Sequence, residues 1–194
     1  MAQAFSVKKL VHFFFEVGTL RKTARSHRQT LLTDDLSDNI ASHSYRVAVI
    51  AHFLALHEKA DPYKTLAMAL FHDTEETRSS DQNWIHKKYV KVYGEEILSG
   101  QEEYAQDEAL LAMRLEYEKR ESPEAIIAKD ADHLDQILLL REYEWQGNKE
   151  AAKWLKGKRQ LRMIKTPLAK LLGEEIYTQE PGAWWEKIWT EKRR

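Results

Sequence analysis

Residues 122–147 read SPEAIIAKDADHLDQILLLREYEWQG and contain a start signal, an apolar period and an end signal for a helix. It opens on Ser122-Pro123-Glu124, where serine is a preferred helix N-cap and proline suits the first helical position. Its apolar residues recur at three- and four-residue spacing, which is the period of an α-helix. Gly147 then favours a helix end. The stretch therefore predicts one long helix that reaches Trp145.

Apolar spacing of the same kind runs through the rest of the chain, and extended runs of β-branched residues are almost absent. No repeat, low-complexity tract or linker interrupts the pattern, so we expect one all-α domain over residues 1–194. The pattern predicts a first helix that ends near Gly18, followed by a long ordered loop from Leu20 to Ile40. A second helix is expected to begin at Ser37 or Asp38, and a third to run from Asp61-Pro62 to about His72. Further helices are expected from Trp84 to Leu98, from about Asp107 to Glu118, and from starts at Asn148 and at Thr166-Pro167.

Composition excludes several classes of protein. The 194 residues carry 30 basic and 31 acidic side chains, a net charge of −1, which argues against binding to a nucleic-acid polymer or a membrane through bulk charge. Cysteine is absent, which excludes disulfides, zinc–cysteine sites and thiol nucleophiles and fits a cytoplasmic location. The longest apolar stretch, Val47 to Leu56, is far shorter than the roughly 20 residues that span a bilayer.

Histidine and aspartate gather at predicted helix ends. His72-Asp73 follows the apolar run 68–71, so this pair is expected where a buried helix meets a pocket. His43 lies near the start of another helix, and Asp132 lies in the long helix. Two imidazoles and two carboxylates suit a divalent cation. The alternative is that the histidines cap helices and the aspartates pair with neighbouring lysine or arginine.

The ordered set His43, His72-Asp73 and Asp132 resembles the HD-domain metal-dependent phosphohydrolases, and more narrowly their 5′-deoxynucleotidase branch. Three motifs carry the resemblance, which covers roughly residues 5–145. They are Ser42-His43-Ser44-Tyr45-Arg46-Val47-Ala48, then His72-Asp73-Thr74-Glu75-Glu76 with Asp81 eight residues after Asp73, and Lys129-Asp130-Ala131-Asp132-His133-Leu134-Asp135.

The resemblance implies a role for each matching residue. His43, His72, Asp73 and Asp132 would hold one divalent metal ion, which is Mn, Co, Fe, Zn or Mg. Glu76 would orient or deprotonate the attacking water, and Asp81 would act as a general acid or hold the sugar 3′ position. Arg25 would clamp phosphate, for which a guanidinium fork is well shaped.

Plainer interpretations of the last three residues stay open. Glu76 fits a solvent carboxylate at a helix end, Asp81 fits an N-cap for the helix that contains Trp84, and Arg25 fits a surface charge. Three positions also depart from the pattern of the family. Ser42 replaces an acidic residue, Ser80 replaces the glycine before Asp81, and Ser26-His27 stands where many relatives have Gly-Trp.

The implied function is release of phosphate from a small nucleotide, a deoxynucleoside 5′-monophosphate, by a homodimeric enzyme. Two alternatives remain: a phosphodiesterase or pyrophosphohydrolase that acts on another nucleotide, and a non-catalytic metal-binding nucleotide sensor or interaction protein. Near the C-terminus, Trp184, Trp185 and Trp189 are expected to close the core or to contact a second copy of the chain.

Overall fold

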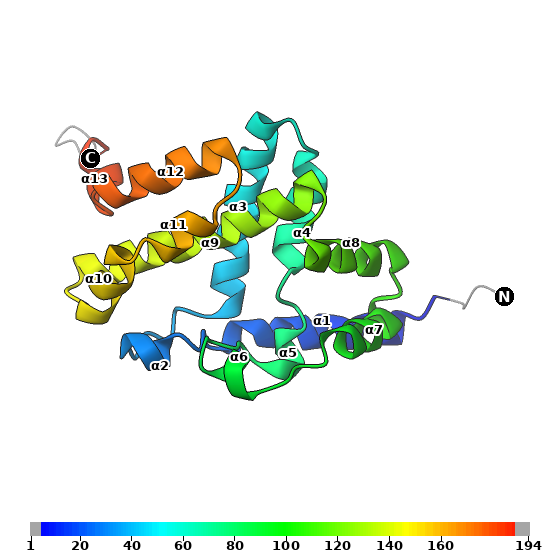
Figure 1. The fold of residues 1–194 in the computed structure, drawn as a ribbon. Helices are drawn as coiled ribbons and strands as arrows, with labels where there is room; N and C mark the ends of the chain where they lie inside the picture. The colour runs from blue at the N-terminus through cyan, green and yellow to red at the C-terminus, as the bar shows by residue number, and fades with distance from the viewer. Residues whose placement is uncertain (1–4, 189–194) are drawn as a thin grey trace, which may run out of the picture.

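The computed structural model describes residues 5–188, and within that range it consists of helices and their connections (Figure 1). The all-α prediction is therefore confirmed. The elements are α1 Val7–Val17, η1 Gly18–Lys22, α2 Arg28–Leu31, α3 Ile40–Glu58, α4 Pro62–Phe71, α5 Glu76–Ser79, α6 His86–Tyr89, α7 Gly94–Ala105, α8 Glu108–Lys119, α9 Pro123–Trp145, α10 Lys149–Lys156, α11 Arg159–Met163, α12 Pro167–Thr178 and α13 Ala183–Glu186.

The long helix α9 forms the centre of the fold. Helices α3, α4, α8, α10, α11 and α12 all pack against it, and α3 crosses it while also packing against α4 (Figure 1). Val47 and Leu54 of α3, Met68 of α4, and Leu134 and Ile137 of α9 are almost wholly buried where these helices meet. Burial of such side chains contributes about 1.5–3 kcal/mol each. This packing fixes α3, α4 and α9 relative to one another.

Helix starts follow the capping residues closely. The Asp61 carboxylate accepts hydrogen bonds from the backbone N–H groups of Tyr63 and Lys64, and α4 begins at Pro62 as expected. Helix α3 differs from the prediction, because its N-cap is Asn39 and not Ser37 or Asp38. The Asp38 side chain is buried against His27 and is thus unable to cap the helix.

Two predicted segments are wrong in detail. The expected helix from Trp84 to Leu98 is broken into α6 and α7, since Val90 has an extended backbone (φ −117°, ψ 133°) between them. The expected loop from Leu20 to Ile40 contains the end of η1 and the four-residue helix α2. A β-bridge between Ala24 and Asn39 joins the two ends of this segment, so the chain between them forms a closed loop.

The C-terminal helices pack against α9, but two tryptophans near the end of the chain stay exposed. Helix α12 packs against α9 and α3. Trp184 and Trp185 are 74% and 52% exposed, so the expectation that they close the core is wrong, and Trp189 lies outside the described residues. Over residues 5–188 the structure contains no helix with the length and apolar character needed to cross a membrane.

Candidate metal centre

Three helices bring the predicted ligands together. His43 lies in the first turn of α3, His72 is the C-cap of α4 with Asp73 directly after it, and Asp132 lies in α9. These positions meet because α3 packs against both α4 and α9. The pattern of apolar residues that forms the core thus also sets the site.

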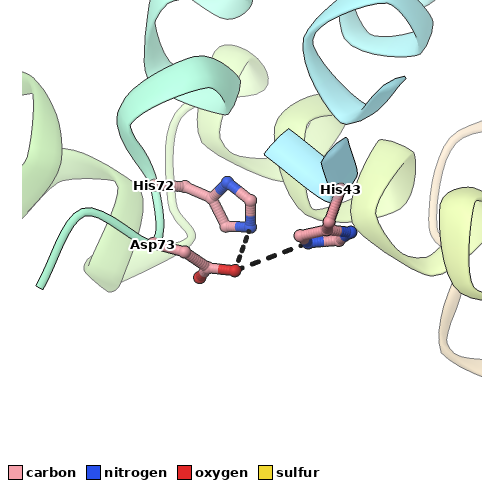
Figure 2. A group of neighbouring side chains, drawn as sticks. All are labelled: His43, His72 and Asp73. Carbon is pink, nitrogen blue, oxygen red and sulfur yellow. Dashed lines mark ion pairs between the residues drawn. The ribbon is translucent and has the colours of Figure 1, made fainter. Parts of the chain in front are cut away.

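The side chains converge on one point, which Figure 2 shows for the first three of them. The Oδ2 atom of Asp73 lies 3.0 Å from Nε2 of His72 and 3.4 Å from Nε2 of His43. One ligand atom from each of these residues lies within 4.8 Å of the other two. Oδ1 of Asp132, from α9, lies 3.3 Å from Nε2 of His43. The four predicted ligands therefore form one cluster, in which His43, His72 and Asp73 lie within mutual ligand distance and Asp132 joins them through its contact with His43.

In His43 and His72, the ring nitrogen Nδ1 already has a hydrogen-bond partner. Nδ1 of His43 lies 2.6 Å from the Asp135 carboxylate, and Nδ1 of His72 lies 2.7 Å from the Ala69 carbonyl oxygen. An acceptor at Nδ1 holds the proton there and leaves the lone pair on Nε2. Both Nε2 atoms are buried and have no hydrogen-bond partner within the described range. Histidines that bind metal are held in this way.

The two nearby aspartates of α9 have separate roles. Oδ2 of Asp132 accepts a hydrogen bond of 2.5 Å from Lys129, while its Oδ1 faces His43. Asp130 points away from the centre, and its carboxylate accepts hydrogen bonds from the backbone N–H groups of Lys165 and Thr166. The register therefore assigns Asp132, and not Asp130, to the cluster.

Charge in the cluster favours a cation. Burial raises the pKa of the Asp73 carboxyl, but His72 and His43 outweigh it and hold the pKa well below its usual range. Burial likewise opposes ionisation of Asp132, and Lys129 and His43 bring its pKa well below the usual range. The centre thus offers two carboxylates and two imidazole Nε2 atoms, which is a donor set that fits a borderline or hard divalent ion.

The same carboxylates also act on His43. Burial and the Arg25 guanidinium lower the pKa of its imidazole, yet Asp135 and Asp132 outweigh both and raise the pKa well above the usual value. The surrounding carboxylates therefore stabilise positive charge at this imidazole in the metal-free protein. A divalent ion would satisfy the same requirement, and it would bind in competition with that proton.

Two hollows open on either side of the centre. Asp73 and Glu76 line a hollow of about 850 Å³, and Asp132 and Arg25 line one of about 330 Å³. Lys87 and Lys129 line both. Asp73 and Asp132 are therefore reachable from outside, and cationic side chains line both hollows.

Glu76 lies at the start of α5, one turn beyond Asp73, whose carbonyl oxygen accepts its backbone N–H. Its Oε2 atom is buried without a partner in the described structure. Burial, with Asp73 and Asp81 nearby, raises the pKa of this carboxyl to about 10. The interpretation of Glu76 as a solvent carboxylate at a helix end is therefore wrong.

Asp81 and Arg25 form a second polar pair at the smaller hollow. Oδ2 of Asp81 accepts hydrogen bonds from the backbone N–H and the hydroxyl of Ser26, and it lies 3.7 Å from Nε of Arg25. Arg25 is only 8% exposed, and its Nε and Nη1 atoms have no hydrogen-bond partner among residues 5–188. Burial opposes its charge, but Asp81 and Asp132 outweigh it and raise the Arg25 pKa. Arg25 is not a surface charge.

The N-cap interpretation of Asp81 is also wrong, since Asn83 accepts the backbone N–H groups of Ile85 and His86 at the start of α6. Before Asp81, Ser80 has φ 58° and ψ 162°, a backbone conformation that only glycine adopts without strain. The departure from glycine therefore places a strained residue beside the site. Ser42, another of the departures, donates hydrogen bonds to the Asn39 side chain at the N-terminus of α3.

Sequence reasoning placed Lys129 and Asp135 in a motif and expected aspartates to pair with neighbouring lysine or arginine, but it gave neither residue a role in supporting the ligands. Asp135 holds His43 and also accepts a hydrogen bond of 2.5 Å from Arg46, and Lys129 holds Asp132. The spacing of three residues from Lys129 to Asp132 and from Asp132 to Asp135 was the available signal, because it places all three on one side of a helix.

Comparison with known proteins identifies the family of the chain. A model of the HD domain family matches residues 17–171. The predicted metal-dependent phosphohydrolase from Magnetospirillum magnetotacticum MS-1 is 26% identical with a TM-score of 0.61, and the match covers 88% of this chain and 95% of that one. A protein from Pyrococcus horikoshii OT3 is also 26% identical, with a TM-score of 0.70 and coverage of 86% and 96%.

A conserved hypothetical protein from Pyrococcus furiosus shares the fold at 24% identity, with a TM-score of 0.71 over 87% of this chain and 99% of that one. No curated protein matches the sequence. The matched range of the family model spans most of the chain and contains all four clustered ligands. The chain therefore belongs to the HD domain family.

Proposed function

We propose that the protein is a metal-dependent phosphohydrolase that releases phosphate from deoxynucleoside 5′-monophosphates. The observation that carries the proposal is the convergence of the two free Nε2 atoms with Asp73 and Asp132, next to hollows lined by Lys87 and Lys129. His43, His72, Asp73 and Asp132 would hold the ion. When bound there, a divalent ion would supply a Lewis acid that neutralises phosphoryl charge and lowers the pKa of water.

The phosphate would be held by cations of the chain. Arg25 is buried with two free nitrogen atoms at the smaller hollow, and a guanidinium suits a phosphate oxygen pair. Lys129 is already oriented by Asp132, and Lys87 stands at the same opening. A phosphate monoester that carries two negative charges would therefore meet three positive groups.

Glu76 would receive the proton of the attacking water. Its raised pKa results from burial beside Asp73 and Asp81. Positive charge near Asp73 would offset these carboxylates and bring the pKa of Glu76 down towards neutral, where a general base works best. Asp81 already accepts two hydrogen bonds from Ser26, so it is better suited to accept a sugar hydroxyl than to donate a proton.

A panel of nucleotides tests the proposal. Purified protein is assayed with deoxynucleoside and ribonucleoside 5′-monophosphates, cyclic dinucleotides and nucleoside triphosphates, each with Mn, Co, Fe, Zn and Mg. Release of inorganic phosphate from the deoxynucleoside monophosphates is the expected result. Diester or pyrophosphate products would replace the proposal with a phosphodiesterase or pyrophosphohydrolase. Binding without turnover would indicate a nucleotide sensor.

A further inference from the structure

The smaller hollow contains an aromatic side chain that the proposed reaction does not use. Trp84 lies in the segment between Asp81 and α6, and it is 46% exposed. It lines the same hollow as Arg25 and Asp132. A half-exposed indole beside a candidate metal ligand is suited to contact a bound molecule rather than the core.

One face of this indole is already covered. The guanidinium carbon of Arg159 lies 3.9 Å from the centre of the Trp84 ring, which is the geometry of a cation–π contact. Arg159 begins α11, so the contact joins the segment 81–84 to the C-terminal helices. A ring that is held on one face loses little further freedom when a flat group packs on it, which favours stacking.

The hollow has the extent of a nucleotide. Lys129, Asp132, His133 and Gln136 line it from one face of α9, and Gln136 lies about 6 Å beyond Asp132 along the helix axis. Trp154 of α10 and Met163 of α11 also line it. The volume of about 330 Å³ falls within the range of small-molecule pockets.

The two hollows differ in the charge of the residues that line them. The acidic residues of the smaller one are Asp81 and Asp132, against Arg25, Lys87 and Lys129. The larger one is lined by Asp73, Glu75, Glu76, Glu95 and Glu118 against Lys87, Lys119, Arg120 and Lys129, and because the raised pKa of Glu76 keeps that carboxyl neutral, its negative and positive groups balance. A negatively charged ligand with a flat aromatic part is therefore favoured in the smaller hollow.

We propose that Trp84 stacks on the nucleobase of the substrate and that Arg159 supports the indole from its other face. The choice of a nucleotide as the ligand rests on the proposed function. Trp84 is then a specificity residue, because it favours phosphate esters with an aromatic base over esters of the sugar alone. Stacking accepts any base, so little discrimination among bases is expected from this contact.

Calorimetric titration of the metal-loaded protein with 2′-deoxyadenosine tests the proposal, because this probe carries the base and cannot be hydrolysed. Inorganic phosphate is the second probe. Trp84→Ala and Trp84→Leu should weaken nucleoside binding roughly 5- to 150-fold, while Trp84→Phe restores most of it. Phosphate affinity should stay unchanged in all three. Trp185→Ala, an exposed tryptophan of α13, is the matched control and should change neither affinity.

Unchanged nucleoside affinity in folded Trp84→Leu protein would overturn the proposal, and so would a wild-type protein that binds no nucleoside. The melting temperature of each variant shows whether it is folded. Failure of the proposed function has a different signature. It would leave nucleoside binding sensitive to Trp84 while no nucleotide of the panel releases phosphate.

Discussion

Nδ1 of His43 lies 2.6 Å from Oδ2 of Asp135, and this contact turns the other ring nitrogen towards Asp73 and Asp132. Asp135 is only 2% exposed, and its carboxylate also accepts a hydrogen bond from Arg46. The orientation of the His43 ring therefore depends on Asp135, which lies about one turn beyond Asp132 on α9. This coupling predicts that the metal centre responds to residues that do not touch the ion.

Asp135→Asn should lower the affinity for a divalent ion about 10- to 100-fold, the usual effect of removing such a supporting carboxylate. The reason is that a neutral amide holds the His43 ring more weakly and lowers the basicity of its Nε2. Metal titration by calorimetry measures the change. Glu142→Gln is the matched control, because Glu142 also binds Arg46 but does not contact His43. Equal losses in the two variants would contradict the role of Asp135.

The two aspartates of α9 should give opposite results. Asp132→Asn should abolish tight metal binding, since its Oδ1 faces His43. Asp130→Asn should retain the metal but lower the free energy of unfolding by about 1–3 kcal/mol, because buried Asp130 receives the backbone N–H groups of Lys165 and Thr166. Metal content and chemical denaturation measure the two effects. Loss of metal only in the Asp130 variant would reject the register of α9.

Glu76→Gln should cut the turnover number by about 10²- to 10⁴-fold, because a positioned base contributes by that factor. Metal content should stay near that of the wild type, and KM should change little while Arg25 still holds the phosphate. Glu75→Gln is a matched control with an adjacent carboxylate that pairs with Arg114. Asp81→Asn tests the competing candidate. Full turnover in Glu76→Gln with saturating substrate would remove the role of Glu76.

The same carboxyl predicts a pH effect in protein freed of metal by a chelator. The folded chain keeps the Glu76 proton up to a pKa of about 10, whereas the unfolded chain releases it near 4.5. Between these values the unfolded state binds fewer protons, so this group lowers stability as pH rises. Glu76→Gln has no such proton. Its melting temperature should match that of the wild type near about pH 5 and exceed it increasingly towards about pH 9. A constant difference would contradict this.

Local chemistry predicted much of the fold. Asp61-Pro62 and Ser122-Pro123 start α4 and α9 as expected, because a cap and its proline act within one turn. The break at Val90 was not predictable, since the segment carries apolar spacing on both sides and α7 is positioned by its packing against α1. The cap Asn39 was missed because the neighbouring Asp38 binds His27, a partner that only the tertiary fold supplies.

The residues of the candidate site also fall into those that the sequence identified and those whose roles depend on the tertiary fold. His43, His72-Asp73 and Asp132 were identified because their order along the chain resembles the motifs of the HD-domain proteins, with the two histidines near expected helix ends and Asp132 inside the long helix. The contacts of Asp130 with Lys165 and Thr166, and of Asp81 with Ser26, join residues far apart in the sequence. Their roles depend on how the helices pack, and no local pattern records them. Trp84 belongs to this second group, since Arg159 reaches it from α11.

If His72 and Asp73 hold one divalent ion together with His43 and Asp132, the metal content of His72→Ala and Asp73→Ala should show it. Elemental analysis of wild-type protein after purification should give about one ion per chain. Both variants should contain none and lack turnover, while circular dichroism shows unchanged helix content. Full occupancy in both variants would contradict the assignment of the metal centre.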